Sequence, residues 1–211
     1  MTGGDRSPMW TVVGSWSVAV RKVKYLVIAA VALASWLVGP AGARADEVVW
    51  RSLGEGGYVI LIRHATAPGT GDPVGFVLED CATQRNLSAE GRAQARRIGA
   101  TLAARKVQID RVLSSRWCRA LETARLLEQG PTEPFPPLDS FFATPALGPG
   151  QTAAVKAFLH AADDQTLVMV THQVNITALT GIFPRAGEMI IAKPGADASD
   201  ALLVVGRIAV D

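Results

Sequence analysis

The sequence of 211 residues lacks several features that would point to other classes of protein. It contains only two cysteines and three histidines, and it shows neither a carboxylate cluster nor a His–Cys spacing that would hold a metal ion. There is no internal repeat and no low-complexity tract. The apolar run Tyr25–Val38 has about 14 residues and falls short of the roughly 20 that cross a bilayer. These absences argue against a metal site, a repeat architecture and a spanning helix.

The first 45 residues have the order of a secretory signal. Basic residues in the segment 21–24 precede the apolar run, and Ala43-Arg44-Ala45 follows it with small residues at the first and third positions. Basic region, apolar core and A-x-A site predict a signal peptide over residues 1–45, with a membrane anchor as the alternative. We therefore expect a mature domain over residues 46–211 that is periplasmic or secreted and contacts the membrane only through its signal.

The charge balance changes when the signal is removed. The whole sequence carries a formal charge of +2, whereas residues 46–211 hold 16 Lys and Arg against 18 Asp and Glu. No basic stripe remains in the mature domain to bind nucleic acid. With 49% hydrophobic residues overall, the chain has the apolar material for one compact domain with a core.

Cys81 and Cys118 are the only cysteines, so only one disulfide can form. In an exported protein an even pair of cysteines is a candidate bridge. Closing a loop of about 38 residues would stabilise the fold by roughly 3 to 4 kcal/mol. Two reduced thiols near the surface are the alternative.

Apolar runs predict strands that alternate with helices. Tyr58–Ile62 is rich in Val and Ile and carries no charge, which suits a strand buried on both faces of a sheet. The alternation along the rest of the chain predicts an α/β domain, a three-layer α-β-α sandwich with a largely parallel central sheet. The further expected strands are 112–113, 167–170, 189–191 and 202–208, and the expected helices are 46–52, 88–105 with Ser88 as N-cap, 117–128, 152–161 and a short one from Ile176.

Histidine and arginine follow the ends of three expected strands. The first strand ends in Arg63-His64, the second leads within a few residues to Arg116 and Arg119, and the strand 167–170 ends in Thr171-His172. The carboxyl ends of parallel strands meet at one rim, where open α/β sheets bind their ligands. One histidine at a strand end is usually structural, but two imidazoles and at least two guanidinium groups at one rim predict a site for an anion.

Four segments resemble the histidine phosphatase superfamily, also called phosphoglycerate-mutase-like, in order along nearly the whole mature chain. The segments are ILIRHA at 60–65, QRNLSAEGRAQA at 84–95, VLSSRWCRALETA at 112–124 and VMVTHQVNI at 168–176. Gln173 stands where the second branch of the superfamily has Asp, so the chain resembles branch 1 and its small exported members. Ala65 replaces the usual Gly after the first histidine and tightens the backbone there.

The resemblance implies a role for each matched residue. His64 matches the nucleophile that takes the phosphoryl group, and His172 matches the second histidine of the pocket. Arg63 and Arg119 match the arginines of the site, and planar guanidinium forks can bind two phosphoryl oxygens at once. A neutral imidazole can attack phosphorus, and fixed cations stabilise the charge of the transition state. Arg116 is offset from the motif and is expected at the rim or the surface.

The proton donor for the leaving group stays open at this point. Asp139 falls about where mutase-like members place their acid and is the first choice. Glu79 or Asp80, in the long loop after the first motif, and Glu188 are the alternatives.

Together these residues predict a metal-independent phosphomonoester hydrolase that needs no cofactor and acts through phospho-His64. The expected substrate is a small phosphorylated molecule, with an envelope phosphosugar as one candidate. The alternatives are a mutase-like phosphotransferase and a catalytically inactive phosphate-binding module of the cell envelope.

Overall fold

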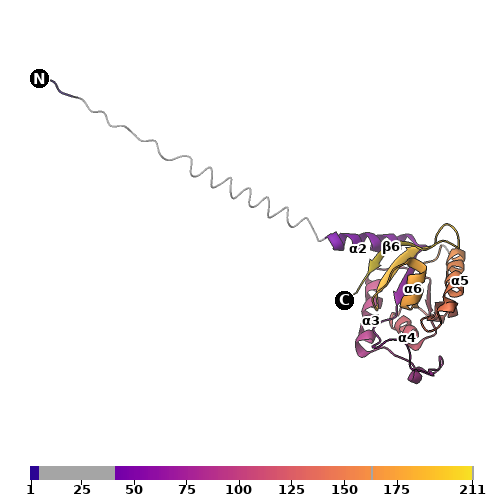
Figure 1. The fold of residues 1–211 in the computed structure, drawn as a ribbon. Coiled ribbons are helices and arrows are strands. Elements are labelled where there is room, and N and C mark those ends of the chain that lie inside the picture. Colours follow the sequence, from indigo (N-terminus) through magenta and orange to yellow (C-terminus); the bar gives the residue numbers. More distant parts are fainter. Residues whose placement is uncertain (5–40, 163, 211) are drawn as a thin grey trace. The chain divides into compact units, whose positions relative to one another are not determined.

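The computed structural model describes residues 1–4, 41–162 and 164–210 (Figure 1). Contacts divide the chain into two units between Arg44 and Ala45, and the sheet lies wholly in the second. The basic segment and the apolar run of the expected signal peptide lie outside the described residues, so the signal and export stay predictions. Within the described ranges, no helix is long and apolar enough to cross a membrane.

A six-stranded sheet forms the centre of the second unit, in the order β3-β2-β4-β1-β5-β6. The first four strands in this order are parallel, β5 is antiparallel to β1, and β6 is antiparallel to β5. The prediction of a largely parallel sheet is therefore confirmed. The strands are β1 (Val59–Arg63), β2 (Arg111–Ser114), β3 (Thr132–Pro134), β4 (Leu167–Thr171), β5 (Met189–Lys193) and β6 (Leu203–Ile208).

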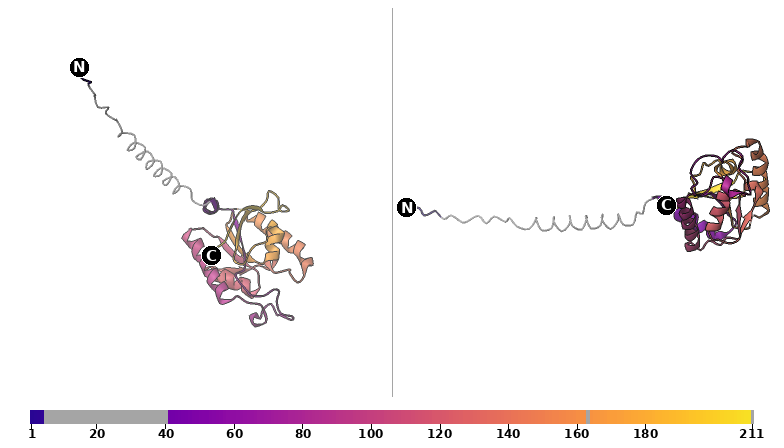
Figure 2. Two further views of the ribbon diagram at one scale, coloured as in Figure 1. Left: turned by 60° about the vertical axis from the view of Figure 1, so that its left-hand side comes forward. Right: turned by 90° about the horizontal axis from the view of Figure 1, so that it is seen from below.

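Helices cover both faces of the sheet, with α3 and α4 on one side and α5 and α6 on the other (Figure 2). Ser88 caps α3 as predicted, because its hydroxyl accepts the Gly91 N–H at 2.9 Å. α5 begins four residues earlier than expected, with Pro149 in its first turn, where the missing N–H needs no partner. The helices are α2 (Ala41–Ser52), α3 (Ala89–Ala104), α4 (Cys118–Leu126), α5 (Gly148–Ala161) and α6 (Gln173–Thr180). Short 3-10 turns occur between the elements: η1 (Leu53–Glu55), η2 (Cys81–Thr83), η3 (Pro136–Leu138) and η4 (Pro145–Leu147).

The side chains of β1 alternate between two cores, because successive residues of a strand point to opposite faces. Ile60 and Ile62 pack on the side of α2, α3 and α4, whereas Val59 and Leu61 pack on the side of α5 and α6. All four side chains are buried, and burial of each contributes about 1.5–3 kcal/mol. One strand thus joins the two helical layers, and the predicted three-layer sandwich is confirmed.

The register of the parallel strands brings three polar segments to one edge. Arg63 pairs with Thr171 across β1 and β4, and Ser114 pairs with Val170 across β2 and β4. The residues that follow these strand ends are therefore neighbours at the same rim, where α/β sheets place their ligands.

Candidate active site

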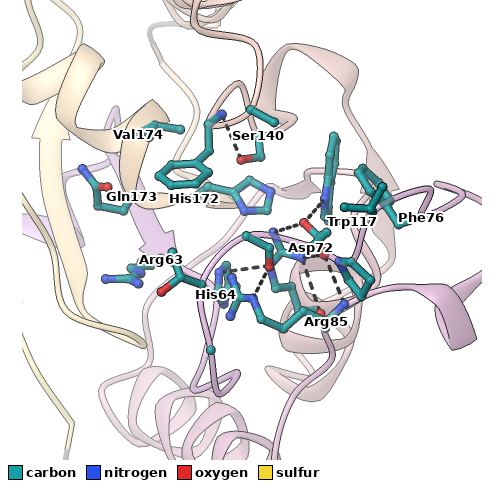
Figure 3. A pocket seen from close by; sticks show the side chains of 18 of the residues that line it. Arg63, His64, Asp72, Phe76, Arg85, Trp117, Ser140, His172, Gln173 and Val174 are labelled. Atoms are coloured by element: carbon teal, nitrogen blue, oxygen red, sulfur yellow. Dashed lines mark hydrogen bonds and ion pairs between the residues drawn. The ribbon is translucent and has the colours of Figure 1, made fainter.

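A cavity of about 620 Å³ opens at this rim of the sheet (Figure 3). Four of the predicted site residues line it: Arg63, His64, Arg119 and His172. The fifth, Asp139, does not. The structure thus brings together two imidazoles and two guanidinium groups from β1, α4 and the end of β4, as the strand pattern predicted.

The His64 ring is buried and held in one tautomer. Its Nδ1 lies 2.8 Å from the carbonyl oxygen of Ala65, and a carbonyl only accepts, so Nδ1 carries the proton. Nε2 is then the unprotonated nitrogen, and Arg119 Nε lies 3.2 Å from it. Burial, with the charges of the nearby arginines, lowers the pKa of His64 to about 3, although the Ala65 hydrogen bond opposes the shift. At neutral pH the ring therefore keeps a lone pair on Nε2.

The backbone that follows His64 is fixed by the two helices on its side. The Ala65 N–H donates to Thr123 Oγ1 at 3.0 Å, and the Thr123 hydroxyl donates to the Arg119 carbonyl at 2.7 Å. Any side chain at Gly91 of α3 would collide with the carbonyl of Thr66. These contacts hold α3 and α4 close against the loop of the nucleophile, so the imidazole and Arg119 keep their relative position.

Arg119 makes a buried ion pair that the sequence did not reveal. Its Nη1 and Nη2 donate to the two oxygens of Asp72 at 2.7 and 3.1 Å. Asp72 also accepts from Trp117 Nε1 at 3.0 Å and from the Arg85 N–H at 3.1 Å. Burial raises the pKa of Asp72, but the hydrogen bonds and charge of Arg119 outweigh it, so the net pKa is lowered and the carboxylate stays ionised. The pair leaves Nε of Arg119 directed at His64.

Two further arginines give the cavity a net positive floor. Arg63 Nη1 donates to the Pro184 carbonyl at 3.0 Å, while its buried Nε has no partner among the described residues. Arg85 Nε donates to the Gly71 carbonyl at 2.7 Å. Across the described part of the chain, no ion pair involves either Arg63 or Arg85. Three guanidinium groups thus face one carboxylate, which suits an anionic ligand.

His172 is held by a different set of partners. Its Nε2 lies 2.8 Å from Ser115 Oγ, and the two histidine rings meet edge to face with centroids 5.3 Å apart. Burial, followed by the charges of His64 and Arg119, holds the pKa of His172 well below its ordinary value. A neutral ring still offers one N–H, so His172 can position an anion without carrying a charge.

Asp139 lies behind Ser115, outside the cavity. Its carboxylate accepts the Arg116 N–H and Nε, both at 2.8 Å, and lies 3.3 Å from Ser115 Oγ. Arg116 itself is about half exposed, as the sequence predicted for a rim or surface residue. In this structure the Asp139 carboxylate faces Arg116 and does not line the cavity, so its expected general-acid role stays a prediction.

The alternative acids also lie outside the cavity lining. Asp80 accepts the Ala82 N–H at 3.0 Å and caps η2, and the neighbouring Glu79 is exposed. Glu188 is buried against Arg207, whose Nε lies 2.8 Å from it. None of the three lines the cavity, and among the described residues Asp72 is the one carboxylate that does.

The predicted disulfide between Cys81 and Cys118 is present. It joins η2 to the first residue of α4, and the side chain of Gln84 adds a bond of 3.0 Å from the Cys118 N–H. The long loop 65–85 is therefore fastened next to the helix that carries Arg119. This explains how a loop residue, Asp72, can reach the buried site.

Comparison with known proteins agrees with this geometry. The family model described as histidine phosphatase superfamily (branch 1) matches residues 59–140. Residues 59–140 thus match the histidine phosphatase superfamily, branch 1. No curated protein sequence matches the chain.

Solved structures similar to this chain show the same fold. The protein histidine phosphatase SixA in complex with tungstate is 20% identical with a TM-score of 0.52, and the match covers 72% of this chain and 96% of SixA. TTHB049 from Thermus thermophilus is 20% identical with a TM-score of 0.51, covering 72% of this chain and 99% of that one. Rv3214 from Mycobacterium tuberculosis is 16% identical with a TM-score of 0.51, and the match covers 70% of this chain and 94% of that one.

The family match contains His64, Arg63 and Arg119, whereas His172 lies beyond it and joins the site through the fold. Asp72 and Arg85 were not identified as site residues from the sequence. Arg85 stands inside a matched segment, which was a signal for it. For Asp72 the signal was only the unusual length of its loop. The superfamily and the cation-lined cavity together support phosphatase or phosphotransferase chemistry.

Proposed function

We propose that the protein is a metal-independent phosphomonoesterase that works through a phosphohistidine on His64. The observation that carries the proposal is the neutral imidazole, whose Nε2 lone pair lies at the floor of a cavity lined by three arginines. An inactive binding module would need the arginines but would not need a nucleophile with its tautomer fixed.

In the first displacement, the Nε2 lone pair of His64 forms a bond to phosphorus, and the bond from phosphorus to the leaving oxygen breaks with its electron pair on that oxygen. The ring becomes positive as it is phosphorylated, and the Ala65 carbonyl stabilises the Nδ1–H at 2.8 Å. The three phosphoryl oxygens gain shared charge in the transition state, and the guanidinium groups of the floor stabilise it.

In the second displacement, a water oxygen bonds to phosphorus and the phosphorus–nitrogen bond breaks. The electron pair returns to Nε2, the water proton passes to solvent or phosphate, and inorganic phosphate leaves. The unpartnered Nε of Arg63 suits a phosphoryl oxygen in both steps.

Hydrolysis of p-nitrophenyl phosphate in the presence of EDTA tests the proposal. We expect turnover to continue with the chelator, because the charge of the phosphoryl group is met by guanidinium groups. A metal-dependent phosphatase would lose activity, an inactive module would bind phosphate without turnover, and a mutase-like phosphotransferase would pass the phosphoryl group to an added alcohol in preference to water.

We also propose that the mature domain acts in the periplasm or outside the cell. The disulfide supports this location, because disulfides persist in oxidising compartments. Sequencing of the mature amino terminus from a cell fraction tests it. A start at Asp46 in the periplasmic fraction or medium is expected, and an intact chain in the cytoplasm would contradict it.

A further inference from the structure

The walls of the cavity differ sharply from its floor. The charged side chains that line the cavity, Arg63, Asp72, Arg85 and Arg119, all belong to the cluster around His64. Above them the wall is largely apolar, and it includes exposed aliphatic and aromatic side chains. These exposed side chains are Val74, Phe142 and Phe183, which are 106%, 53% and 68% exposed.

A continuous series of rings leads from the nucleophile to the outer wall. The centroids of His64 and His172 are 5.3 Å apart, those of His172 and Trp117 are 5.5 Å apart, and those of Trp117 and Phe76 are 5.7 Å apart. Figure 3 shows Trp117 and Phe76 together on one side of the cavity, with Val174 on the other. These centroid distances are those at which aromatic rings attract one another, so another ring in the cavity would find the same contacts.

The wall has few polar side chains, and some of them already form hydrogen bonds within the protein. Besides the floor, the polar side chains that line the cavity are Thr70, Ser140 and Gln173. Gln173 donates its amide to Thr177 at 2.9 Å, and Ser140 Oγ lies 3.4 Å from the Phe142 N–H. A sugar carries several hydroxyl groups that each need a partner when they leave water, and this wall offers little for them.

Among the residues that the structure describes, no carboxylic acid with a proton to donate lines the cavity. Asp72, the one described carboxylate in the lining, is ionised and paired with Arg119, so it has no proton to give. An alkoxide leaves phosphorus poorly without a proton, whereas a phenolate, with a pKa of about 10 for its parent phenol, departs far more easily.

From these observations we propose that the substrate is an aryl phosphomonoester, whose aromatic leaving group lies against the Trp117–Phe76 wall. The proposal rests on the phosphomonoesterase function above and narrows its substrate class. It replaces the envelope phosphosugar as the preferred candidate. The apolar wall is the specificity surface of the site, since it is continuous with the phosphoryl floor.

Four substrates separate the two properties of the leaving group. These are 2-naphthyl phosphate (apolar, acidic parent alcohol), octyl phosphate (apolar, weakly acidic parent alcohol), acetyl phosphate (polar, a mixed anhydride whose carboxylate is the best leaving group of the four) and glucose 6-phosphate (polar, weakly acidic parent alcohol). We expect kcat/KM for 2-naphthyl phosphate to exceed that of each of the other three by about tenfold or more.

A rate for acetyl phosphate or glucose 6-phosphate equal to or above the naphthyl rate would overturn the proposal and leave the phosphatase function intact. An octyl rate equal to the naphthyl rate would also overturn it, since it would show that an apolar body alone suffices. Hydrolysis of none of the four would instead remove the phosphatase function itself.

The variant Phe76→Ser tests the wall directly, because the Phe76 ring forms the wall together with Trp117 and lines the cavity. We expect the ratio of kcat/KM for 2-naphthyl phosphate to that for acetyl phosphate to fall about tenfold, because the aryl group loses apolar contact area. The matched control is Leu203→Ser on β6, an apolar residue that is 62% exposed and does not line the cavity. It should keep the wild-type ratio. An unchanged ratio in the variant Phe76→Ser would show that the leaving group does not lie against the Trp117–Phe76 wall, and the aryl assignment would fail.

Discussion

The ends of β1 and β4 are alike in sequence and different in chemistry. Each is a buried parallel strand that ends in a polar residue followed directly by histidine, Arg63-His64 in one and Thr171-His172 in the other. The Nδ1–H of His64 donates to the Ala65 carbonyl, and Arg119 Nε lies next to its Nε2. In His172, by contrast, Nε2 is hydrogen-bonded to Ser115 Oγ. One imidazole is left with an unprotonated nitrogen at the cavity, and the Nε2 of the other is hydrogen-bonded to Ser115.

The comparison shows that partners far away in the chain decide what a histidine does. The local pattern of apolar strand and histidine delivers both rings to the same rim, with centroids 5.3 Å apart. The roles then follow from which ring nitrogen each partner occupies.

Replacement of the proposed nucleophile should have the largest effect. We expect His64→Asn to lower kcat for p-nitrophenyl phosphate by a factor on the order of 10⁴ or more, because the covalent route is lost. His160→Asn is the matched control, since His160 lies exposed on α5 away from the cavity and should keep full activity. Steady-state kinetics of the two variants measures the difference. Comparable activity in both variants would contradict the assignment.

Replacement of the other ring should slow the reaction without abolishing the intermediate. Loss of one donor to the developing charge costs about 10²- to 10³-fold in kcat, so we expect a fall in this range for His172→Asn. Because His64 is intact, rapid quench should still detect phosphoenzyme. If His172→Asn abolished labelling while His64→Asn retained it, the two roles would have to be exchanged.

Asp139 offers a smaller effect that separates positioning from acid catalysis. Asp139→Asn keeps the shape of the side chain but weakens its bonds to Arg116 and Ser115. We expect a fall in kcat of about tenfold, below the roughly 10²- to 10⁴-fold that a lost general acid costs. The loss should be the same for substituted phenyl phosphates whatever the pKa of their phenol. A loss that grows as the phenol becomes less acidic would restore Asp139 as the acid.

The lowered pKa of His64 predicts a pH dependence of stability. Between pH 6.5 and about 3 the unfolded chain binds a proton at this ring and the folded chain does not, so the free energy of unfolding falls as the pH drops through this range. At pH 5 the loss from His64 is about 2 kcal/mol. Denaturant unfolding should therefore show a shallower decline from pH 7 to pH 5 in His64→Asn than in the wild type. Parallel declines would show that the folded ring titrates normally.

Much of the fold could be predicted because the decisive residues are local. The apolar run before Arg63-His64 specifies a doubly buried strand, and Ser88 specifies the start of a helix. The strand β3 was not predicted, because Pro134 and the surrounding prolines are typical of a loop and are tolerated only on an edge strand. The order of the strands in the sheet likewise depends on contacts that no single segment encodes.

The candidate site was predictable as far as its residues stand at strand ends or in a motif. His64, His172, Arg63 and Arg119 satisfy this condition, and all four line one cavity. Asp72 does not, because a loop reaches the site only through its tertiary contacts with α4. The contact of Asp139 with Arg116, 23 residues away in the sequence, could likewise not be predicted from a local pattern.

The most direct test of the account is to locate the phosphoryl group on the trapped enzyme. Wild-type protein would be mixed with radiolabelled p-nitrophenyl phosphate, quenched in alkali within milliseconds, digested and mapped by mass spectrometry. The account predicts an alkali-stable, acid-labile phosphoryl group on Nε2 of His64. A label on His172, or an acid-stable label on a hydroxyl side chain, would contradict it.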